Sequence, residues 1–130
     1  MTFEQVWAQY DFTESVIVGM RWEAPLTYVL HLNYYWPLRP SGDPSQPTLH
    51  DQYVQVLLRD CVRLMLSFTA PLRSVDGAQH FGTITGWERI VSSAWIEAAP
   101  DPATWLHLIF YVGSADRIEA LCRSIDVQPL

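Results

Sequence analysis

A short polar stretch near the start of the chain comes closest to catalytic chemistry. Asp11 and Glu14 lie three positions apart, and Ser15 follows directly. Such groups can transfer protons and attack a substrate when a basic group activates the hydroxyl. No histidine or lysine lies near Ser15 in the sequence, and aspartate and serine also favour turns. We therefore predict a turn with Phe12 in the core, and keep Asp11 and Glu14 as acidic contacts for a basic partner.

Two histidines lie at comparable positions in predicted strands. His31 and His107 each lie opposite a predicted core stripe. If their strands are neighbours, the two imidazoles could approach each other. The simpler interpretation, which we favour, is two half-exposed histidines of a sheet. No two histidines have metal-ligand spacing on one element, and no cysteine pair accompanies them, so we predict no metal site.

The strand faces opposite the core stripes are unusually rich in aromatic and basic residues. Tryptophan, tyrosine and arginine are enriched at binding hot spots. One interpretation is a binding surface, and the other is a face covered by the N-terminal helix or by a second copy. Both remain open. The residues on these faces are His31, Asn33 and Tyr35, then Arg63 and Ser67, then Trp105, His107, Ile109 and Tyr111.

Three consecutive aromatic residues precede a long proline-rich segment. Successive strand residues point to opposite sides, so Tyr34 and Trp36 cannot share a face with Tyr35. At least one large ring must therefore lie near a surface. Tyr35 and Trp36 are candidates for a binding rim, and an aromatic lid over the end of the sheet is the simpler alternative.

The common catalytic and nucleotide-binding motifs are absent from the sequence. There is no G-x-G-x-x-G, G-x-x-x-x-G-K-[ST], G-x-S-x-G or H-E-x-x-H. The two glycines in residues 82–86 come without the lysine that a phosphate loop uses. We therefore predict no catalytic residues and no cofactor, and favour a protein that is not an enzyme, while leaving an unfamiliar active site open.

Length and composition predict one globular domain over residues 1–130. Hydrophobic residues make up 49% and charged residues only 17% of the chain, which favours an ordered core over disorder. Fewer charges than usual also leave room for an apolar or aromatic contact surface.

The charge balance argues against several partner classes. The net charge is −6 and no basic run occurs, so we predict no nucleic-acid binding. An acidic protein suits a basic partner. We expect no signal peptide, no membrane span, a cytoplasmic location, and reduced thiols at Cys61 and Cys122.

The elements that must position these residues follow from periodicity. Thr2 and Gln5 form a capping-box pattern, and helical spacing predicts a short helix over residues 3–10. Strands are predicted over 16–22, 26–35, 53–58, 62–68, 80–85, 90–98, 106–112 and 118–127, the last with a short helix as the alternative. Four prolines predict a long internal loop over residues 36–51.

Alternation divides the strongest strands into two faces. The predicted core stripes are Leu26, Tyr28, Leu30, Leu32 and Tyr34, then Val62, Leu64, Leu66 and Phe68, then Leu106, Leu108, Phe110 and Val112. Because long helices do not alternate with the strands, we predict a mainly β fold with a minor α component. The expected architecture is an antiparallel sheet or sandwich of about six to eight strands, with a short N-terminal helix.

The start of the first strand resembles that of some small β-rich bacterial domains. Glu14, Ser15 and Ile17 match their pattern of an acidic residue, a serine and an aliphatic residue at the strand opening. These domains include immunity proteins of polymorphic toxin systems, of the immunity-protein-50-like kind. Several such families have a histidine before the acidic residue, where this chain has Thr13. The resemblance implies a cytoplasmic inhibitor that binds a toxin domain without catalysis.

Three hypotheses about function follow. The first is a non-enzymatic protein-binding domain, in its specific form an immunity-type inhibitor of a bacterial toxin. The second is a small-ligand binder or enzyme with a pocket lined by His31, Tyr35, Trp105 and His107. The third is a structural homo-oligomer, a homodimer for example, in which the mixed face pairs with itself.

Overall fold

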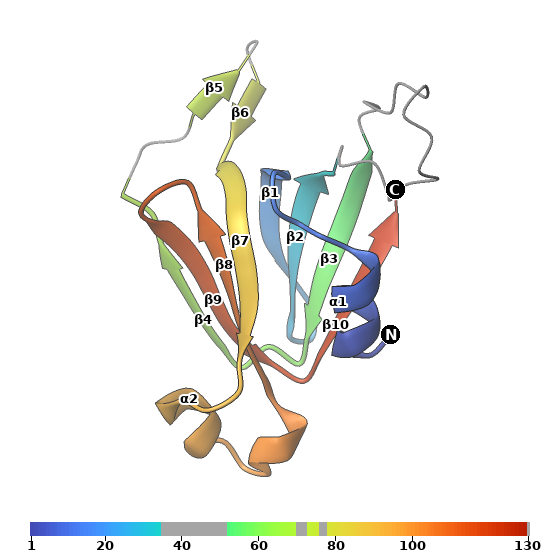
Figure 1. The fold of residues 1–130 in the computed structure, drawn as a ribbon, viewed down its shortest axis with the longest axis vertical. Coiled ribbons are helices and arrows are strands. Elements are labelled where there is room, and N and C mark those ends of the chain that lie inside the picture. The colour runs from blue at the N-terminus through green and yellow to red at the C-terminus, as the bar shows by residue number, and fades with distance from the viewer. Residues whose placement is uncertain (35–51, 70–72, 76–77, 130) are drawn as a thin grey trace.

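The protein is mainly β, as predicted, with an eight-stranded antiparallel sheet and a short N-terminal helix (Figure 1). The computed structural model describes residues 1–34, 52–69, 73–75 and 78–129. Two further short strands form a separate pair. The elements are α1 (Phe3–Gln9), β1 (Val16–Glu23), β2 (Thr27–Asn33), β3 (Tyr53–Arg59), β4 (Arg63–Ser67), β5 (Arg73–Val75), β6 (Ala78–His80), β7 (Gly82–Ile90), α2 (Ala94–Glu97), η1 (Pro102–Thr104), β8 (Leu106–Val112), β9 (Asp116–Cys122) and β10 (Ser124–Pro129).

The sheet bends into two halves, with strand order β10-β3-β2-β1 in one and β7-β8-β9-β4 in the other (Figure 1). Only two residue pairs join β1 to β7. The chain also passes twice between the halves, from β3 into β4 and from β9 into β10. At these bends the Arg123 amide donates to the Arg59 carbonyl and the Val62 amide donates to the Leu121 carbonyl, each at 2.9 Å. The strand pairing therefore continues through the bend.

One hydrophobic core draws residues from both halves of the sheet. The predicted stripe on β8 is confirmed, since its four members are at most 8% exposed. Phe12 is fully buried and contacts the rings of Tyr34, Trp87 and Phe110. The core therefore unites alternating strand positions with the segment that leaves α1.

Helix α1 forms as its sequence pattern predicts. The Thr2 hydroxyl accepts from the Gln5 amide, and the Gln5 side chain accepts from the Thr2 amide. A helix of seven residues is marginal alone, so it depends on docking. Val6 is fully buried in the core, and Phe3 and Trp7 pack against Trp87 of β7.

Two predicted elements differ from the structure. A strand was expected over residues 90–98, but β7 ends at Ile90 and residues 94–97 form α2. Ser93 explains the change, because its hydroxyl caps the helix by accepting from the Ile96 amide at 3.1 Å. The single element expected over residues 118–127 is two strands, which are separated at Arg123 where the sheet bends.

Three residues predicted in core stripes are instead exposed. Leu26 is 47% exposed because it lies in the turn before β2. Val62 and Leu66 are 54% and 42% exposed because β4 is the last strand of its half-sheet. Conversely, Thr27 and Val29 are buried, so both faces of β2 are covered there. Alternation located the strands but not which faces would be covered.

Candidate functional site

Four of the nine predicted site residues, Arg63, Trp105, His107 and Tyr111, gather on one surface, the face of β7, β8, β9 and β4 that points away from the core. We name this the outer face. Strand register places His107 opposite Leu121, which lies opposite Arg63. In the same way Tyr111 lies opposite Arg117, which lies opposite Ser67. Directly opposed residues share a face.

A buried polar network occupies the α2 end of the outer face. His107 is 3% exposed, and its Nε2 lies 2.6 Å from a carboxylate oxygen of Glu119, which is itself 8% exposed. The Ser93 hydroxyl lies 2.7 Å from His107 Nδ1 and also accepts the Ile96 amide. Both imidazole nitrogens therefore have partners, as burial requires.

This network has the composition of a serine–histidine–acid relay, but its contacts also have a structural role. The hydroxyl that a relay would activate already caps α2. The Glu119 carboxylate also lies 3.6 Å from Arg117 Nη2. These hydrogen bonds tie α2 to β8 and β9.

Stacked rings cover the same end of the outer face. The Trp95 ring of α2 stacks on His107 with centroids 4.7 Å apart and planes 7° apart. The Arg63 guanidinium lies over the Trp95 ring, 4.1 Å from the ring centroid. The covering element is thus α2, and neither the N-terminal helix nor a second copy is needed there.

Trp105 is a packing residue beside α2. It is 5% exposed and forms a small cluster with Ile96 and Leu121. Its ring nitrogen donates to the Pro100 carbonyl at 2.6 Å. The Arg123 guanidinium lies 4.8 Å from the ring centroid. Trp105, a candidate for the binding surface, is therefore part of a satellite core.

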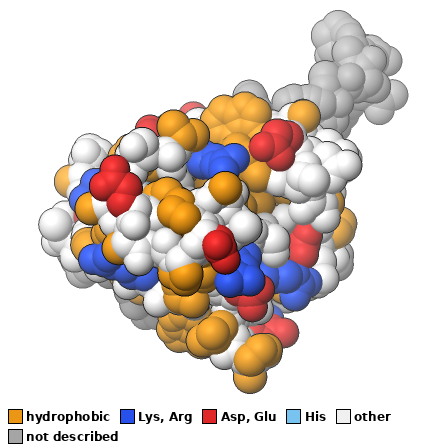
Figure 2. All heavy atoms as spheres, turned by 90° about the horizontal axis from the view of Figure 1, so that it is seen from below, with side chains coloured by type: hydrophobic (Ala, Val, Ile, Leu, Met, Phe, Trp, Pro, Cys, Tyr) orange, Lys and Arg blue, Asp and Glu red, His pale blue; other side chains and the backbone are white. Residues whose placement is uncertain are grey.

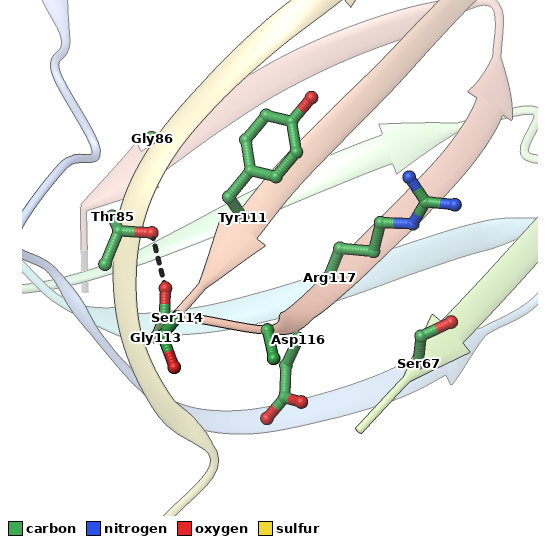
Figure 3. Close-up of a pocket in the computed structure, with 9 residues that line it drawn as sticks. Ser67, Thr85, Gly86, Tyr111, Gly113, Ser114, Asp116 and Arg117 are labelled. Carbon is green, nitrogen blue, oxygen red and sulfur yellow. Dashed lines mark hydrogen bonds between the residues drawn. The ribbon is translucent and has the colours of Figure 1, made fainter. Parts of the chain in front are cut away.

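The opposite end of the outer face is open and hollowed, as Figure 3 shows. The hollow has a volume of about 670 Å³ and is lined by residues including Ser67, Thr85, Tyr111 and Arg117. Tyr111 donates to a Glu88 carboxylate oxygen at 3.1 Å. Burial and this hydrogen bond raise the pKa of the Tyr111 phenol. Arg117 is 47% exposed, so its guanidinium can meet a ligand.

Strand β4 borders the outer face and exposes apolar side chains. Val62, Met65 and Leu66 are 54%, 41% and 42% exposed, and Arg63 is exposed beside them. We name Val62, Arg63, Met65 and Leu66 the β4 edge. Within the described part of the chain, β4 pairs only with β9. Seen from the α2 end, hydrophobic and charged side chains of both signs are interspersed (Figure 2).

His31 lies away from this surface, on β2 in the other half-sheet. In the sheet order β1 and β7 lie between β2 and β8, so His31 and His107 are not on neighbouring strands. His31 contacts the Arg21 guanidinium and the Gln55 amide. Burial and the neighbouring Arg21 charge lower the pKa of its imidazole. The condition for a two-histidine site is not met, and His31 is separated from the predicted pocket residues Trp105 and His107.

The turn at residues 11–15 forms as expected. The Asp11 carboxylate accepts from the Thr13 amide at 3.0 Å, and Glu14 adopts a positive φ of 78°. Both acidic residues are exposed, while Ser15 is 1% exposed. Tyr35, Trp36 and the predicted loop 36–51 lie outside the described residues.

Both cysteines lie inside the protein, away from solvent. Cys61 and Cys122 are both buried and reduced. Burial raises the pKa of the Cys61 thiol to about 11, and burial also raises the pKa of Cys122, to which the nearby Cys61 contributes. Among the described residues no three His, Cys, Asp or Glu side chains could hold a metal ion. None of the helices in those residues has the length and apolar character to span a bilayer.

Ser93, Trp95 and Glu119 were missed as functional neighbours of His107. The serine three residues before Ile96 was a capping signal, but the strand interpretation of residues 90–98 concealed it. Glu119 stands between aliphatic residues, and nothing local shows that its partner is twelve residues earlier. The residues behind the resemblance, Glu14 and Ile17, flank the start of β1. Comparison with known proteins finds no matching family model, no matching curated protein and no matching solved structure.

Proposed function

We propose that the chain is a protein-binding domain without catalytic activity, and that it docks its partner through the β4 edge. The observation that carries this proposal is an end strand which, together with the residue before it, exposes three large apolar side chains. Native proteins usually protect an end strand with charges, prolines or a covering element. Unprotected apolar strands suit a partner that covers them.

The neighbouring surface supports this role. The network of Ser93, His107 and Glu119 ties α2 to the outer face beside β4, which restrains the side chains there before a partner binds. A rigid surface loses little conformational entropy on binding, which favours affinity. Arginine and tyrosine at its open end add the residue types that dominate binding energies.

In its specific form, the proposal is an immunity-type inhibitor of a bacterial toxin. This form rests on the resemblance carried by Glu14, Ser15 and Ile17. The net charge of −6 favours attraction of a basic toxin domain before contact. Asp11 and Glu14, both exposed, supply acidic contacts for such a partner.

Co-expression with a toxin domain encoded beside this chain tests the proposal. We expect the chain to restore growth and to bind the toxin in a purified titration. Val62→Glu should weaken binding at least tenfold, because it places a charge in the apolar contact. Val91→Glu is the matched control, since Val91 is 78% exposed and lies between β7 and α2 rather than next to β4. Equal binding by both variants, or no binding by the unaltered chain, would contradict the proposal.

A homodimer is the second candidate function, because a copy of β4 could also cover the β4 edge. Light scattering across a concentration series separates the two. A monomer at high concentration, whose binding to the toxin depends on Val62, supports the first function. A stable dimer that dissociates on Val62→Glu supports the second.

A further inference from the structure

The free side of β4 has the geometry needed to accept another strand. On one side its residues pair with β9 in unbroken register, from Arg63 opposite Leu121 to Ser67 opposite Arg117. In the described part of the chain no strand pairs with its other side. Alternate backbone amides and carbonyls of an end strand point outward and can form a new ladder. The partner can therefore bind as an extended segment.

Local charge on the outer face of β4 and β9 is opposite in sign to that of the whole chain. Arg63 and Arg117 are both exposed and lie at the two ends of the β4–β9 ladder. Between them are Met65 and Glu119. The Glu119 carboxylate is buried and shared between His107 at 2.6 Å and Arg117 at 3.6 Å, so it offers little charge to a ligand, while Arg117 stays 47% exposed.

Other carboxylates near this surface are also engaged. Asp116 accepts from the Thr69 amide at 2.8 Å and from its hydroxyl at 2.7 Å. Glu88 accepts from Tyr111. The arginines at the ends of the ladder are therefore the groups with donors left for a partner.

We infer that the partner adds a strand with the pattern acidic, apolar, apolar, apolar, acidic along β4; this inference rests on the proposed function and names the partner segment. Strand residues alternate between faces, so the first, third and fifth residues lie over the outer face. The outer two carboxylates meet Arg63 and, across the small Ser67, Arg117. The third residue covers Met65.

The second and fourth residues of the added strand lie on the core side of β4. There they meet Leu64, which is half-buried, and Leu66, which is 42% exposed. Covering these side chains removes apolar surface from water, so both positions are apolar. The residues on the two faces of β4 thus determine the residue type at all five positions of the added strand.

A second copy fits this surface less well than an acidic strand. Its β4 would present Arg63 and Ser67 where the two carboxylates are required. Pairing two copies would also gather four exposed arginines, Arg63 and Arg117 from each, on one surface. Like charges near one another oppose pairing.

Peptide titration followed by amide NMR of the full chain tests the inference. The acidic probe has the core Glu-Val-Phe-Val-Glu between Gly-Ser flanks, and the control probe replaces both glutamates with arginine. We expect saturable shifts at the amides of residues 62–67 with the acidic probe. The basic probe should bind about tenfold more weakly, because two cross-strand ion pairs become repulsions.

Charge reversal in the protein completes the test. Arg117→Glu, whose side chain makes no ring contact in the structure, should reduce the preference for the acidic probe several-fold, and Arg63→Glu with Arg117→Glu should invert it. Unchanged preference, shifts elsewhere, or no shift at millimolar peptide would overturn the inference. If the toxin binds but leaves the amides of residues 62–67 unchanged, the inference fails and the proposed function stands. Self-association that alters these amides would assign β4 to a second copy instead.

Discussion

The two end strands of the sheet, β10 and β4, differ in how far other parts of the chain cover them. Helix α1 packs beside β10, and Asp126 of β10 binds both the N-terminal ammonium at 3.1 Å and Arg59 at 2.6 Å. Beside β4 the described residues include no such covering element, and Val62, Met65 and Leu66 are exposed. Within the described residues, one end strand is protected and the other is left available. This difference is the main basis for the docking site that we propose.

The contrast is informative because both end strands form in the same way, where a paired strand crosses the bend between the two half-sheets. Strand β3 continues into β4, and β9 continues into β10, so the bend exposes one new side in each half-sheet. Among the described residues, a helix packs beside the end strand near the N-terminus, and none packs along the free side of β4. An uncovered end strand with exposed apolar side chains, such as β4, favours association with another chain.

The largest effect is expected beneath α1. Phe12→Ala should lower the free energy of unfolding by about 3–5 kcal/mol, because it leaves a cavity among buried rings. Chemical denaturation measures the loss. Tyr53→Ala is the control, since Tyr53 is 44% exposed and should cost much less. Similar losses in both variants would break the distinction between covered and exposed aromatic residues.

The same substitution, made in the helix beside β10 and next to β4, compares the covered end of the sheet with the uncovered end. Val6→Thr should destabilise by about 1–3 kcal/mol, because it buries a hydroxyl in the core under α1. Val62→Thr should change stability by no more than about 0.5 kcal/mol, because Val62 is already in water. Denaturant titrations of the two variants give the difference. A large loss for Val62→Thr would show that the β4 edge is covered in the isolated protein.

A smaller effect is expected at the cap of α1. Thr2→Ala removes the hydroxyl that accepts the Gln5 amide and should cost about 1 kcal/mol. Thermal unfolding should show a correspondingly lower midpoint. Gln9→Ala, an exposed change in the same helix, should leave the midpoint nearly unchanged. If both variants behave alike, the cap contributes nothing to covering β10.

The smallest effect concerns Asp126 and pH. Burial raises the pKa of its carboxyl, but the bonds from Arg59 and the N-terminal ammonium outweigh burial, so the pKa lies below the ordinary 3.8. A lowered folded-state pKa gives stability that is present above pH 3.8 and lost as pH falls through the lowered value. Asp126→Asn should remove less than about 1 kcal/mol at neutral pH, because the carboxylate is partly exposed. Its stability should then fall less steeply with acid than that of Glu97→Gln, a control at an exposed carboxylate.

Local signals in the sequence predicted much of the fold. The capping residues Thr2 and Gln5, the alternating stripe on β8 and the turn at residues 11–15 all depend on neighbours within a few positions. The same local reasoning failed at residues 94–97, where the apolar pattern concealed a capped helical turn. Short apolar runs are ambiguous between strand and helix.

The candidate site was predicted only in part. Alternation placed Arg63, Ser67, His107 and Tyr111 on outward faces, and the register confirms that they share one surface. His31 also alternates with a core stripe, yet it lies in the other half-sheet. The sequence of a single strand does not determine which strands become its neighbours.

The sequence by itself determined the class of fold, the helix start, most of the strand positions and the outward direction of the mixed face on β4 and β8, since these follow from side-chain periodicity and local hydrogen bonds. Only the tertiary structure decided which faces are covered. Glu119 became a partner of His107, Trp105 became a core residue, and β4 became an exposed end strand because the sheet bends at Arg59 and Arg123. Burial depends on what packs against a residue, and those contacts join segments far apart in the chain.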